Sequence, residues 1–289
     1  MKVTGFSFIR NAIKYDYPIV EAIQSILPIC DDFVVAVGNS EDDTLELIRN
    51  IDPSKIKIIE TVWDDSLREG GKVLAVETNK AFQAISDDAD WAFYIQGDEV
   101  MHEKYLPVVK SAMEKYLHHK KVDGLLFNYT HFYGSYDYVG ASPRWYSNEI
   151  CVVRNNKSIY SFRDAQGFRK GDNEKLKVKA VDASIYHYGW VKPPESMQKK
   201  QEDFNKLWHN DQWIDKNIAK ASGFDYSTVD LLTLFNGQHP QVMKKRIANQ
   251  NWKFDHDISI NRLSFKNKIK RGLKKYLGIN IGYKNYVKI

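Results

Sequence analysis

Short apolar runs alternate with helical stretches over the first 95 residues, and this alternation restricts the possible folds more than any other feature of the sequence. The run 33–37 is entirely apolar and lies between Asp32 and Gly38, which is typical of a strand buried on both faces. Strands that alternate with helices form a parallel sheet covered by helices. The predicted order is strand 3–9, helix 18–29, strand 33–37, helix 45–51, strand 56–62, helix 73–85 and strand 91–95.

The regular alternation ends after residue 100. An aromatic, glycine-containing stretch at 130–149 predicts a hairpin or a long loop over a site, and Pro193-Pro194 ends the sheet region. We therefore expect an α/β domain over 1–195, a helical extension over 196–258 and a basic amphipathic tail over 259–289. The remaining predicted elements are helix 105–117, strand 124–129, shorter antiparallel or mixed strands at 150–154, 159–163 and 178–187, and a helical region at 196–221.

Composition narrows the class of protein. With 43% apolar and 27% charged residues the chain is globular. No stretch is long and apolar enough for a membrane span or a secretory signal, so we expect a cytoplasmic protein. Its 2 cysteines, Cys30 and Cys151, are too few for a disulfide framework or a zinc site, and both are expected to be reduced and buried.

The charge is distributed unevenly. The chain has 42 basic and 37 acidic residues, and the segment 262–289 contains nine of the basic residues and no acidic one. The rest of the chain is therefore mildly acidic, with four more acidic than basic residues. A nucleic-acid binder should carry basic residues over the body of its fold, so no nucleic-acid partner is expected.

Ligands of open parallel sheets bind beyond the carboxyl ends of the strands, and polar residues follow each apolar run here. In the motif YIQGDEV at 94–100, Asp98 ends an apolar strand abruptly, which is how a hard cation is presented to a phosphate. Asp98 could equally cap a following helix. His187, in YHYGW at 186–190, could complete a metal site begun by Asp98 or be a hydrogen-bonded structural residue.

Other nucleotide-binding motifs are absent. A phosphate-binding P-loop has a Gly five residues before its Gly-Lys pair and a Ser or Thr directly after the pair. Around Gly71-Lys72 these positions are Ser66 and Val73, so the segment is not a P-loop. No G-x-G-x-x-G follows the first strand, which removes the dinucleotide fingerprint.

Four motifs in one order resemble the GT-A fold glycosyltransferases of family 2: SFIRNA at 7–12, AVGNSEDDT at 36–44, YIQGDEV at 94–100 and YHYGW at 186–190. The resemblance covers about residues 1–195. It implies a GT-A-like, Rossmann-like, mostly parallel sheet flanked by helices, with a helical C-terminal extension. It also implies a donor that is a nucleoside-diphosphate sugar of the UDP or GDP type, and Mn²⁺ or Mg²⁺ as the cofactor. Gln96 departs from the family by replacing the first Asp of its D-x-D motif, and Asn39 by replacing a Gly.

The resemblance assigns roles to individual residues. Asp98 would ligate the metal and His187 would be a further metal or diphosphate ligand. Lys72 could meet a phosphate or be an exposed helix-start lysine. The residues expected around the nucleotide sugar are Phe8, Arg10, Asn11, Gly38, Asn39, Ser40, Asp43, Lys72, Gln96 and Gly97.

Sugar transfer with inversion also needs a carboxylate that deprotonates the acceptor hydroxyl. Family members supply it between the two metal-binding elements, where Asp164 is the first candidate and Glu149 the second. A salt bridge of Asp164 with Arg163 or Arg169 is the structural alternative. The aromatic stretch at 130–149 would pack against a sugar acceptor or form a structural cluster.

Apolar and basic residues interleave at helical spacing in the tail, which predicts a basic amphipathic helix. It could lie on an anionic membrane surface, at the inner face of the membrane, or pack on the acidic body. A membrane position would suit a lipid-linked saccharide acceptor, as in surface-polysaccharide assembly. Two further functions remain open: a non-catalytic subunit that binds nucleotide sugar or glycan, and a nucleotidyltransferase.

Overall fold

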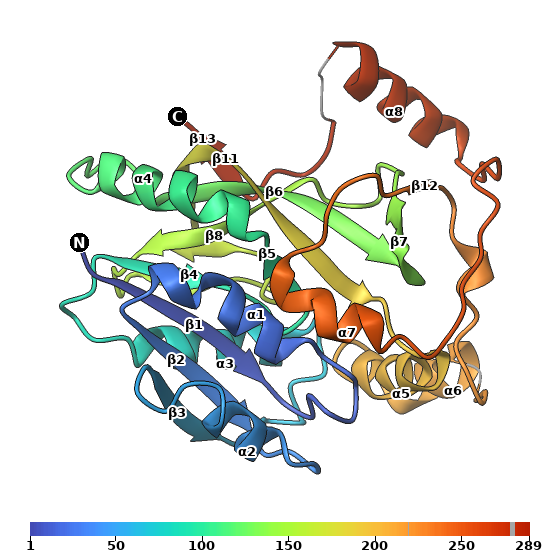
Figure 1. Ribbon diagram of the computed structural model, residues 1–289, viewed down its shortest axis with the longest axis horizontal. Coiled ribbons are helices and arrows are strands. Elements are labelled where there is room, and N and C mark those ends of the chain that lie inside the picture. The colour runs from blue at the N-terminus through green and yellow to red at the C-terminus, as the bar shows by residue number, and fades with distance from the viewer. Residues whose placement is uncertain (219, 278–280) are drawn as a thin grey trace.

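The computed structural model describes residues 1–218, 220–277 and 281–289, and is built around one large sheet (Figure 1). Neighbouring strands follow the order β3-β2-β1-β4-β8-β6-β11-β10-β9. The first four of these are mutually parallel: β3 (Ile56–Thr61), β2 (Asp32–Gly38), β1 (Val3–Ile9) and β4 (Trp91–Tyr94).

Helices cover both faces of this parallel part. The strands are apolar on both faces, so each face has its own core. On one face α1 and α4 pack through residues such as Ile23 and Met113, and on the other α3 packs through Phe82. The predicted α/β fold class, with a mostly parallel central sheet flanked by helices, is confirmed. The helices are α1 (Ile19–Ile26), α2 (Thr44–Arg49), α3 (Lys72–Gln83) and α4 (Leu106–Tyr116).

The second part of the sheet is mixed. Strand β8 (Asn148–Arg154) is antiparallel to both of its neighbours, β4 and β6 (Gly124–Tyr133). β11 (Glu174–Trp190) is parallel to β6 and longer than the predicted 178–187. β7 (Ser135–Gly140) turns back on β6 to form the predicted hairpin. Three short strands complete this part: β5 (Glu99–Met101), β9 (Ile159–Ser161) and β10 (Phe168–Lys170).

The segment after residue 193 wraps around one end of the sheet and returns to it (Figure 1). Its helices are α5 (Pro194–Asn205), α6 (Asp211–Asn217), α7 (Lys244–Ala248) and α8 (Phe265–Leu277). Its strands are β12 (Leu232–Leu234), which pairs with β7, and β13 (Tyr286–Lys288), which pairs with β11. The end of the predicted tail is therefore part of the central sheet, while the domain boundaries at 195 and 258 stay predictions.

Two expectations concern individual features. Cys30 and Cys151 are free and buried, as predicted. In the described ranges, no helix has both the length and the apolar character needed to cross a membrane. The predicted tail helix is present as α8, and none of its residues is buried.

Candidate functional site

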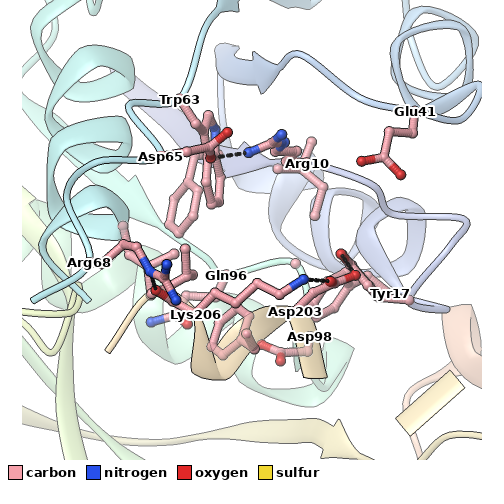
Figure 2. Close-up of a pocket in the computed structure, with 17 residues that line it drawn as sticks. Arg10, Tyr17, Glu41, Trp63, Asp65, Arg68, Gln96, Asp98, Asp203 and Lys206 are labelled. Carbon is pink, nitrogen blue, oxygen red and sulfur yellow. Dashed lines mark hydrogen bonds and ion pairs between the residues drawn. The ribbon is translucent and has the colours of Figure 1, made fainter. Parts of the chain in front are cut away.

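A cavity of about 350 Å³ opens beyond the carboxyl ends of β1 and β4 (Figure 2). This is the edge at which an open parallel sheet binds its ligands. The wall nearest the sheet comes from the predicted motifs, and the facing wall comes from the end of α5. The lining residues are Phe8, Ile9, Arg10, Tyr15, Tyr17, Glu41, Trp63, Asp65, Arg68, Leu74, Gln96, Gly97, Asp98, Asp203, Phe204, Lys206 and Leu207.

Arg10 is fixed on the sheet side of this first cavity. Its guanidinium donates to Asp65 Oδ1 at 2.8 Å and to the Asn39 carbonyl at 3.0 Å, and lies 5.5 Å above the ring of Trp63. Gly38 is required beneath this ring, because a Cβ there would lie 2.3 Å from Trp63 Nε1. In the turn after β2, Gly38 and Asn39 therefore shape the cavity from behind, and Glu41 lines it.

The facing wall depends on contacts between distant parts of the chain. Asp203 accepts a hydrogen bond from Tyr15 at 2.8 Å, and Arg68 donates to the Lys206 carbonyl at 2.9 Å. Arg68 and Lys206 bring cationic groups to the cavity, where Arg68 pairs with Asp211 and Lys206 with Asp203, each at 2.8 Å (Figure 2). Sequence reasoning missed both, because a basic residue in a loop or at a helix end carries no motif of its own.

A second cavity of about 240 Å³ adjoins the first, and Asp98 lies on their shared wall. Asp98 Oδ2 is 3.4 Å from Lys200 Nζ, and Asp98 Oδ1 is 3.7 Å from His187 Nε2. Burial by itself would raise the pKa of Asp98, but the charges of His187 and Lys200 outweigh it and hold the pKa below its usual value. Gly189 is needed here, since a Cβ would lie 2.6 Å from Asp98 Oδ2.

A second histidine orients His187. His131 Nε2 lies 2.8 Å from the Tyr146 carbonyl, which can only accept, so this nitrogen carries a proton. Burial lowers the pKa of His131 to about 3, so the ring is neutral and its Nδ1 accepts from His187 Nδ1 at 3.2 Å. Burial lowers the pKa of His187, and in the neutral ring the lone pair lies on Nε2, which faces Asp98. That is the state of a metal-ligating imidazole, whereas the protonated ring would be a cation paired with Asp98.

This donor set fits a divalent cation that the substrate completes. Asp98 Oδ1 and His187 Nε2 face each other, while Lys200 occupies the other carboxylate oxygen. Within residues 1–218, 220–277 and 281–289, no group of three His, Cys, Asp or Glu side chains could hold a metal without further ligands. Mg²⁺ commonly binds through one or two protein side chains plus substrate phosphates.

The second cavity also contains carboxyl groups that favour their neutral form. Burial, followed by the charges of Glu99 and Asp164, raises the pKa of Glu149 to about 8. Burial also raises the pKa of Asp164. Asp164 stands between Arg163 and Ala165, which both have positive φ, at 56° and 62°. Such backbone strain in non-glycine residues is concentrated at functional sites.

The predicted site residues fall into groups according to the cavity that they line. Asp98 lines both cavities, and His187, Asp164 and Glu149 line the second. Phe8, Arg10, Gln96 and Gly97 line the first cavity. Gly38, Asn39, Ser40 and Asn11 form the turn behind it, where Asn11 Oδ1 accepts from the Glu41 amide at 2.7 Å.

Asp43 and Lys72 lie apart from these cavities. Asp43 is exposed at the start of α2 and is not among the lining residues. Lys72 is exposed and pairs with Glu69 at 2.7 Å, as its alternative reading supposed. Their near neighbours in the sequence, Glu41 and Arg68, line the first cavity instead. Asp164 makes no ion pair with Arg163 or Arg169 among the described residues; Arg169 donates to the Asn285 carbonyl instead.

Comparisons with known proteins give distant matches. No protein-family model matches the chain, and no curated protein does. Among solved structures, TarS of S. aureus is 14% identical, with a TM-score of 0.40 over 70% of this chain. Glucosyl-3-phosphoglycerate synthase from Mycobacterium tuberculosis, in complex with Mn²⁺, uridine diphosphate and phosphoglyceric acid, is 20% identical, with a TM-score of 0.30 over 45% of this chain.

A third solved structure is a protein of another kind. The 4-diphosphocytidyl-2C-methyl-D-erythritol synthase from Anaerococcus prevotii is 11% identical, with a TM-score of 0.39 over 66% of this chain and 91% of its own. The match covers 38% of the TarS chain and 43% of the glucosyl-3-phosphoglycerate synthase chain. This chain therefore spans well under two thirds of the length of those two proteins.

Proposed function

We propose that the chain is a glycosyltransferase of the GT-A type, similar to family 2, that moves a sugar from a nucleoside-diphosphate sugar to a saccharide or lipid-linked saccharide. One observation carries the proposal. Asp98, with His187 and Lys200 against it, lies on the wall shared by a cavity of about 350 Å³ and a second cavity lined by carboxyl groups. A diphosphate would lie at this wall under the proposal, with its nucleoside in the first cavity and its sugar in the second.

The nucleotide would occupy the first cavity. The rings of Phe8 and Trp63, 5.9 Å apart, offer an apolar surface to a base. Arg68 and Lys206 lie across the cavity and offer charge to a phosphate. A UDP or GDP group would therefore meet an apolar surface on one side and ion-paired cationic side chains on the other.

Asp98 and His187 would hold Mn²⁺ or Mg²⁺ when the donor binds. The cation would stabilise the negative charge that develops on the leaving diphosphate. Lys200 adds a fixed charge beside Asp98, and His131 keeps the lone pair of His187 Nε2 directed at Asp98. Gln96, in place of the first Asp of the family motif, lines both cavities without adding charge.

The acceptor hydroxyl would be deprotonated in the second cavity, on the face of the sugar opposite the diphosphate, which inverts the anomeric centre. Asp164 and Glu149 are the two candidates for this base. The raised pKa of each suits a group that must take up a proton near neutral pH.

The location of the acceptor extends this proposal. α8 has exposed apolar side chains, among them Phe265 and Leu277, beside its lysines and arginine. A helix of this kind binds anionic lipid surfaces. We therefore propose a cytoplasmic protein that is peripheral at the inner face of the membrane, with a saccharide acceptor that is presented there.

A thermal-shift screen tests the donor site. UDP, GDP, CMP, dTDP and their sugars are added with and without Mn²⁺ to the wild type, Asp98→Asn and the exposed control Asp87→Asn. A ligand at a hundred times its dissociation constant adds about 2.7 kcal/mol to the free energy of unfolding. We expect one nucleotide to shift the wild type and Asp87→Asn in a Mn²⁺-dependent way, and to leave Asp98→Asn unshifted.

Other results would favour the alternatives. If the nucleotide sugar binds but is neither hydrolysed nor transferred, the chain is a binding subunit rather than an enzyme. If only a nucleoside triphosphate binds and pyrophosphate is released, the reaction is nucleotidyl transfer. If no nucleotide binds, the glycosyltransferase proposal is wrong.

A further inference from the structure

A third cavity, of about 340 Å³, adjoins the second on the side away from the first. The second and third cavities share Tyr146, Glu149 and Gln166 in their linings. The second and first share Asp98, whereas the third shares no lining residue with the first. The three cavities therefore follow one another, and a molecule in the third reaches the reacting region past Glu149.

The third cavity is basic. Arg144, Arg163 and Lys284 line it, and Glu149 is its single acidic lining residue. Within the described ranges no carboxylate lies within 4.0 Å of Arg163 or Lys284, and the nearest to Arg144 is Asp230 at that distance. Arg163 and Lys284 therefore have no paired carboxylate among the described residues, and Arg144 has only this long ion pair, so the three cations favour an anionic ligand.

Two buried acceptor atoms at this cavity have no partner in the protein. They are Glu149 Oε2 and Asn285 Oδ1, and Asn285 is only 5% exposed. Buried polar atoms are normally hydrogen-bonded, so unpaired ones indicate a partner that binds there. Gly167 brings both side chains close: its φ is 94°, and a Cβ would lie 2.5 Å from Asn285 Nδ2 and 3.3 Å from Glu149 Oε2.

The wall that contains Asn285 is built by the end of the chain and is held firmly. Arg169 is buried and donates to the Asn285 carbonyl at 2.8 Å and to the Tyr283 hydroxyl at 2.7 Å. Asn285 Nδ2 donates to the Gln166 carbonyl at 2.6 Å, which leaves Oδ1 for a ligand. Directly after Asn285 the chain forms β13, which pairs with β11 and so fixes this wall to the sheet.

We propose that this third cavity is the acceptor site, and that the acceptor is a polyol or saccharide that carries a phosphate or carboxylate group. Its anionic group contacts Arg144, Arg163 and Lys284, and its hydroxyl groups donate to Asn285 Oδ1 and Glu149. Lys274 of α8 donates to Ser147 at the cavity rim at 2.7 Å, so α8 lies next to this entrance. The proposal rests on the proposed function, because it assigns the second substrate of the same site.

Binding of small probes to the full chain tests it. The anionic probes are sn-glycerol-3-phosphate and galacturonic acid, and the neutral ones are glycerol and galactose, each titrated by NMR or calorimetry. The proteins are the wild type, the double variant Arg144→Gln/Arg163→Gln and the control Lys110→Gln, an exposed lysine of α4. We expect the anionic probes to bind more tightly than the neutral ones, and the double variant to weaken them by about tenfold or more, with Lys110→Gln unchanged.

Three results would overturn the proposal: equal binding of neutral and anionic probes, unchanged affinity in the double variant, or an equal loss in Lys110→Gln. Melting temperatures confirm that the variants are folded, and nucleotide affinity, measured in the same samples, should not change. If anionic probes bind as expected but no nucleotide binds, the proposed function fails and the basic cavity itself stands. If nucleotides bind but anionic probes do not, this inference alone fails.

A phosphate group can also come from a lipid headgroup. Vesicles of phosphatidylglycerol, compared with soluble sn-glycerol-3-phosphate on the same proteins, separate the two sources. Loss of binding to either one in the double variant supports the cavity as the site. Vesicle binding that both arginine substitutions leave unchanged, without binding of the soluble probe, contradicts it.

Discussion

The two parts of the sheet differ in how they are assembled. Strands β1 to β4 are parallel, follow each other through single helices, and bury apolar residues on both faces. Strands β6, β8 and β11 are joined through a hairpin, an antiparallel insertion and long loops. The first part presents loop ends to the first cavity, and the second presents buried acids and histidines to the cavity beside it.

Under the proposed function, this difference would separate donor recognition from the chemical step. In the first part Arg10 is paired with Asp65. In the second part burial raises the pKa of Glu149 and lowers that of His131. Perturbed titrating groups in a cleft are candidates for catalysis, whereas paired charges at a rim suit binding. The predictions below test that division.

Loss of the reaction base should have the largest effect. We expect Glu149→Gln or Asp164→Asn, whichever removes the base, to slow sugar transfer by about 10²–10⁴-fold with donor affinity retained. If Glu149 is the base, the wild-type rate rises with pH up to about 8, because the carboxyl must lose its proton first. The measurement is the transfer rate against pH, with Glu174→Gln and Asp172→Asn as exposed controls. Full activity in both variants would place the base elsewhere.

Truncation of one core phenylalanine in each part of the sheet should lower stability in both cases but nucleotide affinity in only one. Phe6 of β1 contacts Phe82 and Phe168, and Phe132 of β6 stacks on Tyr188 at 4.7 Å. Each Phe→Ala change should cost about 3–5 kcal/mol in urea unfolding. Nucleotide affinity should fall in the folded Phe6→Ala protein and not in Phe132→Ala. Equal loss in both would show that the sheet responds as one unit.

Asp98 connects the two parts, and its removal should impair both functions. Asp98→Asn should lower the transfer rate by about 10²–10³-fold and also weaken the Mn²⁺-dependent part of nucleotide binding. Lys200 would lose its counter-charge in the same variant. The check is nucleotide affinity with and without Mn²⁺ alongside the rate. A variant with a lower rate but unchanged metal dependence would separate Asp98 from the cation.

The smallest effect on stability is expected at α8. Phe265 and Leu277 are 80% and 65% exposed, so Phe265→Ser/Leu277→Ser should change the free energy of unfolding by less than about 0.5 kcal/mol. The same variant should lose binding to anionic vesicles in a sedimentation assay. Val62→Ser, at an exposed valine near the other edge of the sheet, is the control. Vesicle binding that persists in the double variant would contradict the membrane role of α8.

Local pattern predicted the first part of the fold well. The strand 3–9 was predicted with the bounds of β1, and the helices and strands up to residue 94 lie within three residues of their predicted ends. The reason is that apolar periodicity and turn residues act over a few positions. The long β11 was predicted too short because three of its first four residues are Glu or Lys, and because Gly189 interrupts the apolar pattern at its other end.

The site was predicted in part. The strand ends gave Arg10, Gln96 and Asp98, because any parallel sheet places them at one edge. Lys206 of the facing wall and Lys200 at Asp98 follow from the packing of α5, about a hundred residues away along the chain. Asn285 lies near Glu149 because β13, directly after it, pairs with β11, whereas the sequence predicted this segment as part of a basic amphipathic tail.

The sequence by itself therefore determined the strand-helix alternation, the parallel half-sheet and the edge at which polar groups gather. Those features depend on interactions between residues that are near in the chain. Only the tertiary structure decided which charges surround Asp98, which imidazole nitrogen of His187 faces it, and that the third cavity adjoins Glu149. Those features depend on long-range packing and burial, which set the pKa of each group and bring together side chains that no local pattern connects.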